Sequence, residues 1–247
     1  MAPATMASTF ALSDQQIRTI ASKRVFFGHK SVGANILEGV RDLMAADSRL
    51  KLKLVTSGDP SSVQGPALIE SEVGENGIPS SKNAAFAAAL SKGMGTQGGI
   101  AMYKYCYVDV TDSTDVPRLF EEYRRGIESL VAEHPNVRII HITVPLTTVE
   151  PATKAWVKGV LGRHTARAAN IKRNEFNRLL KQTYPADSIF DLAEVESTLP
   201  DGSRSYFSSG TDRIYTLAEE YTTDGGHLNE LGRKAAAERL LTLLANI

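Results

Sequence analysis

The sequence predicts a three-layer α/β/α sandwich around a five-stranded parallel sheet. Three observations carry this prediction: apolar strands alternate with amphipathic helices, no internal repeat interrupts the alternation, and 247 residues suffice for one layered unit. Parallel neighbours need crossover connections, so the alternation favours βαβ units with helices on both faces of the sheet. We expect residues 1–12 to form a tail and residues 13–247 to form a single domain.

Local patterns place the elements in order along the chain. Ser13 and Gln16 have the spacing of a capping box at the start of the first helix. Clusters of β-branched and aromatic residues predict strands at residues 24–28, 51–56, 98–109, 137–144 and 188–193. Apolar residues at helical spacing predict later helices that begin near residues 32 and 81 and that cover residues 116–131, 168–182 and 231–244. The Gly-, Pro- and Ser-rich residues 57–81 are predicted to form a long loop.

Composition excludes several classes of protein. The 28 basic and 28 acidic side chains balance, whereas a general nucleic-acid binder needs a basic excess. The single cysteine, Cys106, excludes an intrachain disulfide and a cysteine-rich zinc site. No apolar run is long enough for a membrane helix, and residues 1–8 lack the features of an intact signal peptide. We therefore expect neither nucleic acid nor a membrane as partner.

The first candidate for chemistry is Ser31. Ligands of open parallel sheets bind beyond the carboxyl ends of the strands, and Gly28-His-Lys-Ser31 ends the first predicted strand where a helix begins. The backbone N–H groups at the start of a helix are free to stabilise a negative charge. A serine nucleophile needs such donors because its attack on a carbonyl creates an oxyanion. The alternative is that Ser31 only caps the helix. A phosphate loop is excluded because Arg24 and His29 occupy positions where that motif requires glycine.

The second candidate is the sequence Asp224-Gly-Gly-His227, just before the last helix. An aspartate three residues before a histidine on a tight loop can hold one ring nitrogen and leave the other free. In a parallel sheet this loop returns to the edge where Ser31 lies. The alternative is ordinary turn chemistry at Asp224 and a structural loop histidine.

Between about residues 24 and 244 the chain resembles the SGNH or GDSL hydrolases. Gly28 and Ser31 match the first block of that family with one additional residue between them, and Asp224 and His227 match the last block. The resemblance implies a flavodoxin-like sandwich and a Ser–His–Asp esterase that uses no cofactor and no metal. It also implies a small acyl ester as substrate, such as an acetyl group on a carbohydrate, and a location outside the cytoplasm.

The resemblance also implies an oxyanion hole, in which Ser31 and Gly77 would supply backbone N–H groups. The third block would correspond to Cys106-Tyr-Val-Asp109, where Val108 replaces the asparagine donor of the family. Asn76, beside Gly77, carries an amide that would replace this donor. The alternative is that Asn76 and Gly77 form only a turn.

Three further residues are candidates for substrate binding: His29, Lys104 and Asp109. His29 could instead be a hydrogen-bonded structural residue, and Lys104 and Asp109 could form a structural ion pair with each other. Sequence alone leaves three functions open. They are an esterase, a carbohydrate O-acyltransferase that uses the same site, and a non-catalytic glycan-binding domain, which the missing asparagine favours.

Overall fold

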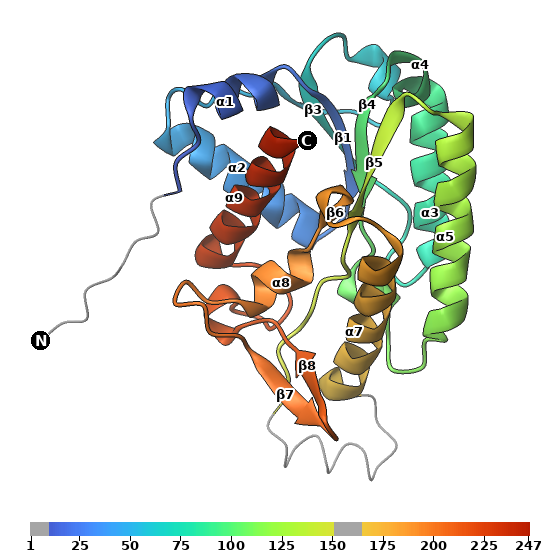
Figure 1. Cartoon of the computed structure of the whole chain (residues 1–247), viewed down its shortest axis with the longest axis vertical. Helices are drawn as coiled ribbons and strands as arrows, with labels where there is room; N and C mark the ends of the chain where they lie inside the picture. The colour runs from blue at the N-terminus through green and yellow to red at the C-terminus, as the bar shows by residue number, and fades with distance from the viewer. Residues whose placement is uncertain (1–9, 151–164) are drawn as a thin grey trace, which may run out of the picture.

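The computed structural model describes residues 10–150 and 165–247, and in these residues the fold is a three-layer α/β/α sandwich (Figure 1). The central sheet has six parallel strands in the order β2-β3-β1-β4-β5-β6. The strands are β1 Arg24–His29, β2 Leu54–Thr56, β3 Ala67–Glu72, β4 Gly99–Tyr103, β5 Val137–Ile142 and β6 Ile189–Phe190. The predicted layered architecture is confirmed, but the predicted count of five strands is wrong.

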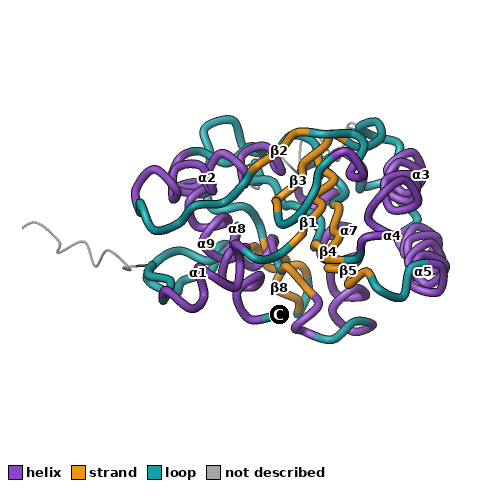
Figure 2. Tube along the Cα trace, turned by 90° about the horizontal axis from the view of Figure 1, so that it is seen from above, coloured by secondary structure: helices purple, strands orange, loops and turns teal. Residues whose placement is uncertain are grey.

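Helices cover both faces of the sheet. In Figure 2 the strands lie between two groups of helices. One face carries α1 Asp14–Ala21, α2 Val32–Ala46, α8 Leu192–Ser197 and α9 Glu230–Asn246. The other face carries α3 Pro79–Ala89, α5 Val116–Glu133 and α7 Ala166–Thr183, and the short α4 Gly95–Gln97 follows α3. A two-stranded hairpin, β7 Tyr206–Ser209 and β8 Asp212–Tyr215, stands apart from the sheet.

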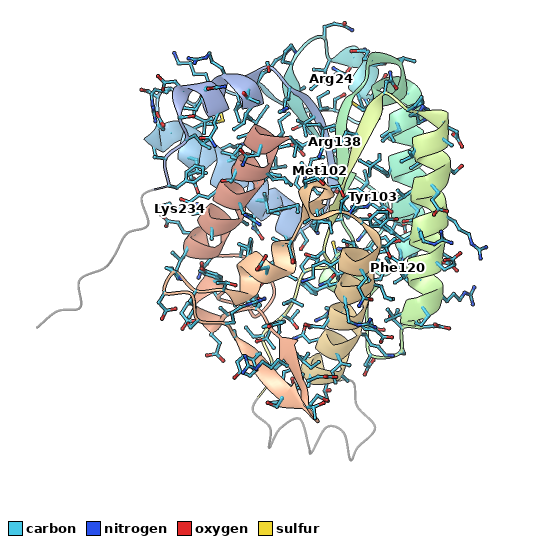
Figure 3. The ribbon with its side chains drawn as sticks, in the orientation of Figure 1. Arg24, Met102, Tyr103, Phe120, Arg138 and Lys234 are labelled. Atoms are coloured by element: carbon cyan, nitrogen blue, oxygen red, sulfur yellow. The ribbon has the colours of Figure 1, made fainter. Side chains whose placement is uncertain are left out.

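Each face of the sheet has its own hydrophobic core because successive residues of a strand point to opposite sides. Met102 packs in the cluster with α2 and α9, and its neighbour Tyr103 packs in the cluster with α3 and α5. Figure 3 labels both of these residues, together with Phe120 of the second cluster. Of the predicted tail, residues 1–9 lie outside the described residues, while Leu12 is buried against the first cluster.

Two boundaries differ from the sequence prediction in a way that matters for the site. Strand β3 lies inside the stretch predicted to be a loop, and it separates β1 from β2. The strand predicted at residues 98–109 ends at Tyr103, and Tyr107–Asp109 form a 3-10 turn. Residues beyond Tyr103 therefore belong to a loop at the carboxyl edge of the sheet.

Candidate active site

Ser31 lies at a strained turn between β1 and α2. Its φ of 53° is the only positive value at a non-glycine residue within the described ranges. A positive φ is energetically unfavourable for a serine residue, and strained backbone of this kind is concentrated at functional sites. Although Ser31 holds the N-cap position of α2, its side chain makes no capping hydrogen bond. The hydroxyl is instead hydrogen-bonded to Nε2 of His227, 196 residues away in the sequence.

Asp224 orients His227 from within the same loop. Its Oδ2 lies 2.6 Å from Nδ1 of His227, and its Oδ1 accepts the N–H groups of Gly226 at 2.9 Å and His227 at 2.8 Å. These hydrogen bonds, the His227 N–H first among them, hold the pKa of Asp224 well below its usual range. A carboxylate beside Nδ1 favours a proton on that nitrogen, so Nε2 is left to accept the Ser31 proton.

Neighbouring elements hold the loop of residues 224–228 in place. The Asn35 side chain on α2 accepts the N–H of Leu228 at 3.2 Å. Thr148, after β5, donates its N–H to the carbonyl of Gly225 at 2.9 Å. About half of the Asp224 and His227 side-chain surfaces remain exposed, at 54% and 44%. The structure thus brings the three predicted triad residues together and leaves them accessible to a ligand.

Of the two predicted oxyanion donors, Gly77 has its N–H engaged elsewhere, whereas Asn76 is held through its side-chain oxygen. The N–H of Gly77 donates to Oδ1 of Asp109 at 2.7 Å, and the side-chain oxygen of Asn76 accepts from Nζ of Lys82 at 3.1 Å. The Gly77 assignment therefore needs correction, because an N–H bound to a buried carboxylate is not available to an oxyanion. Val108 cannot supply the missing donor either, since its side chain is apolar and exposed.

Gly74 precedes Gly77 in the same loop and lies two residues after the end of β3. In the β1–β3 register His29 pairs with Glu72, so Ser31 and Gly74 each follow this pair by two residues at one edge of the sheet. Gly74 has a φ of 61°, and a Cβ there would lie 2.5 Å from the backbone nitrogen of Lys82. Its N–H has no hydrogen-bond partner among the described residues. Only glycine fits this turn without strain.

The three predicted substrate-binding residues are buried, so the structure does not place them in an open cleft. His29 is 4% exposed, and its Nε2 lies 2.7 Å from Oε2 of Glu70. Burial lowers the pKa of His29 despite this carboxylate. The predicted structural alternative thus fits His29.

Lys104 and Asp109 do not pair with each other, contrary to the predicted alternative. Lys104 is 1% exposed, and its Nζ lies 3.2 Å from Sγ of Cys106. Burial lowers the pKa of Lys104. Asp109 instead forms an ion pair with Lys82.

Sequence reasoning missed the residues that surround the triad on its open side. The Tyr107 ring meets the His227 ring edge-on, with 5.8 Å between centroids. A cleft begins beside Asp224, and the described residues that line it include Tyr107, Thr111, Ser113, Thr147, Thr148 and Arg173. Tyr107 falls within residues 98–109, which the sequence predicts to be a strand, so its position in a loop is not evident from the sequence.

Residues 10–150 and 165–247 contain no cluster of three or more His, Cys, Asp or Glu side chains arranged to hold a metal ion. In the same ranges no helix has the length and apolarity needed to cross a membrane.

No family model and no curated protein sequence matches the chain. Solved structures match it in fold. A candidate platelet activating factor from Streptococcus pneumonia is 16% identical, with 93% of this chain and 91% of that chain covered and a TM-score of 0.50. A candidate lipolytic protein of the G-D-S-L family from Desulfitobacterium hafniense is 9% identical, with 90% and 99% covered and a TM-score of 0.45.

A candidate SGNH hydrolase from Slackia heliotrinireducens is 14% identical, with 90% of this chain and 98% of that chain covered and a TM-score of 0.45. The likeness to the Streptococcus pneumonia protein is one of fold.

Proposed function

We propose that this protein is a serine esterase that cleaves a small acyl ester. The observation that carries the proposal is the continuous chain of hydrogen bonds from Ser31 Oγ through His227 to Asp224. Its three members come from two loops at opposite ends of the sequence, and Ser31 adopts a strained backbone to join them. A structural cap or an ordinary turn would not require this arrangement.

In the proposed reaction, Ser31 Oγ attacks the ester carbonyl while its proton passes to Nε2 of His227. Asp224 keeps the other ring nitrogen protonated and stabilises the imidazolium that forms. The ring then returns the proton to the leaving alcohol, and a water molecule repeats the sequence to release the acid and restore Ser31. We propose that the backbone N–H groups of Ser31 and Gly74 donate hydrogen bonds to the oxyanion, because both residues lie at the same edge of the sheet.

For the substrate we propose an acetyl ester, with a carbohydrate hydroxyl as its alcohol. The support is the family resemblance of the sequence and the hydroxyl-bearing side chains along the cleft beside Asp224, such as Thr147 and Thr148. Hydroxyl groups suit a polyol because each can both donate and accept a hydrogen bond.

The test is hydrolysis of an activated acetyl ester by the wild-type protein and by Ser31→Ala. We expect the variant to keep its fold by circular dichroism and to lose the hydrolysis. A matched control is Ser80→Ala, which removes an exposed serine hydroxyl from the first turn of α3. Hydrolysis retained by Ser31→Ala would overturn the assignment of the nucleophile. An inactive wild type would instead favour the glycan-binding domain.

A further inference from the structure

A fully buried ion pair lies behind the proposed oxyanion loop. The side chains of Asp109 and Lys82 are both 0% exposed and are joined directly. The Asp109 carboxylate also accepts the N–H of Gly77 at 2.7 Å and the N–H of Cys106 at 2.5 Å. One carboxylate therefore ties together α3, the loop after β3 and the loop after β4.

The loop after β3, residues 74–78, takes its shape largely from these contacts. Lys82 donates to the Asn76 side chain at 3.1 Å as well as to Asp109. Ser81, also in the first turn of α3, accepts the N–H of Glu75 at 2.7 Å. The loop contains no helix, and its isolated bridge joins only Glu75 and Ile78. Its position relative to Ser31 thus depends on α3 and on Asp109.

The loop after β4 carries Asp109 and reaches the proposed catalytic residues themselves. Sγ of Cys106 lies 3.8 Å from the carbonyl oxygen of Lys30, which immediately precedes Ser31. Tyr107 packs edge-on against His227. A displacement of Asp109 would therefore shift the oxyanion loop relative to the segment that contacts both Ser31 and His227.

Stability alone is a weak reason for such a pair. The cost of removing two charges from water offsets much of their attraction, so apolar replacement of a buried pair is often neutral. Position is a stronger reason, because a displacement of about 1 Å at a reacting group can cost as much as ~10²-fold in rate. Hydrogen bonds from three segments to one carboxylate would fix the positions of these segments relative to one another.

We propose that Asp109 and Lys82 are positioning residues that hold the Gly74 N–H in register with Ser31 for the oxyanion. This inference rests on the proposed esterase function. Neither side chain reaches the substrate, because both are completely buried. They act through the backbone of residues 74–78. A backbone donor in this loop would make up for Val108, which stands in the loop after β4 where the hydrolase family has an asparagine donor.

The experiment compares Asp109→Asn and Lys82→Met with the wild type on an activated acetyl ester. We expect kcat to fall by about 10–100-fold with KM changed by less than about threefold, as for the loss of a contact made in the transition state. Affinity for a boronic acid, which forms a tetrahedral adduct with Ser31, should fall in parallel with kcat/KM. A purely structural role would lower the melting temperature and leave both of these quantities unchanged.

Tyr123→Phe is the matched control, because it removes a buried hydrogen bond of 2.9 Å to His141 away from the site. We expect it to lower stability and to keep kcat. If the single variants do not fold, the double variant Lys82→Met/Asp109→Leu replaces both buried charges with apolar side chains, and its kcat should still be reduced.

A folded Asp109→Asn with wild-type kcat and boronic acid affinity would overturn the positioning role, as would a folded double variant with wild-type kcat. In both cases the proposed function would stand, since the wild type would be active and Ser31→Ala inactive. A wild type without esterase activity would overturn the proposed function, and the positioning role with it.

Discussion

At the scale of single residues, the site depends on the chain of hydrogen bonds that joins Ser31, His227 and Asp224. Ser31 donates to His227, and Asp224 holds the opposite ring nitrogen and the loop N–H groups at once. Asp224 therefore has two tasks, to orient the ring and to shape the loop. We therefore expect substitution of Asp224 to have a different effect on activity from substitution of Ser31 or His227.

We predict that Ser31→Ala and His227→Ala lose activity to the same extent and that the double variant is no slower than either. Members of a triad act as a unit, so their removal is not additive. Asp224→Asn should lose less or at most the same, because it disturbs the tautomer and keeps the base. Steady-state kinetics on one activated ester would measure all four variants. A double variant far slower than both single variants would show that Ser31 and His227 act independently.

Sequence patterns predict that Ser31, Asp224 and His227 lie together, as the structure has them, but they do not predict the residues around them, and the reason is physical. The rule that ligands bind at the carboxyl ends of parallel strands brings Ser31 and the loop of His227 to one edge without any knowledge of side-chain packing. The partners of Asp109 and Asn76 depend on the course of irregular loops, for which sequence has no period. The sequence therefore predicts Gly77 as the donor, although Gly74 follows the His29–Glu72 pair by two residues, as Ser31 does.

At the scale of elements, the site depends on the packing of α2, which begins just after Ser31, against α9, which begins just after His227. Their backbones approach closely at Gly39. A Cβ at Gly39 would lie only 2.3 Å from the carbonyl oxygen of Arg233 on α9. Glycine is thus required at this contact even though it weakens a helix.

Gly39→Ala should lower the free energy of unfolding by about 1–3 kcal/mol, because the overlap outweighs the gain in helix propensity. Gly126→Ala is its control on α5, where an added Cβ has no atom within 4 Å. That substitution should raise the free energy of unfolding by about 0.5–1 kcal/mol. Urea denaturation measures both changes, and stabilisation by Gly39→Ala would contradict the close helix contact.

Strand β3 shows why one element escaped prediction. Ala67-Leu-Ile-Glu-Ser-Glu72 has only three apolar residues, and glycine, proline and serine surround it, so its composition is that of a loop. Pairing with β1 and β2 on either side forms the strand. The opposite error occurred after Tyr103, where aromatic residues predict a strand but are buried in a loop by tertiary contacts.

At the scale of the whole molecule, stability should depend on pH through Glu196 of α8. This side chain is fully buried. One carboxylate oxygen accepts the N–H of Leu146 at 2.6 Å, while the other has no hydrogen-bond partner in residues 10–150 and 165–247. Burial raises the pKa of Glu196 to about 8, although Lys104 and Arg173 oppose the rise. The folded protein thus retains a proton that the unfolded chain releases near its ordinary value of 4.5.

The contribution of Glu196 to stability should therefore fall as pH rises from about 4.5 to 8 and level off above. Glu196→Gln carries no charge at any pH and can still accept from Leu146, so it should lack this contribution. Between pH 6.5 and 8.5 we expect the melting temperature of the wild type to fall more than that of Glu196→Gln. Equal slopes for the two proteins would contradict a protonated Glu196 in the folded state.

The central claim is that Ser31 is a nucleophile activated by His227, and reaction with a fluorophosphonate tests it most directly. Only an activated serine reacts quickly with this reagent, and peptide mass spectrometry identifies the residue that is modified. We predict rapid modification of Ser31 in the wild type and in Ser80→Ala. His227→Ala should react at least about 10²-fold more slowly, as expected when a general base is lost. Modification of another residue, or equal rates in the wild type and His227→Ala, would contradict the claim.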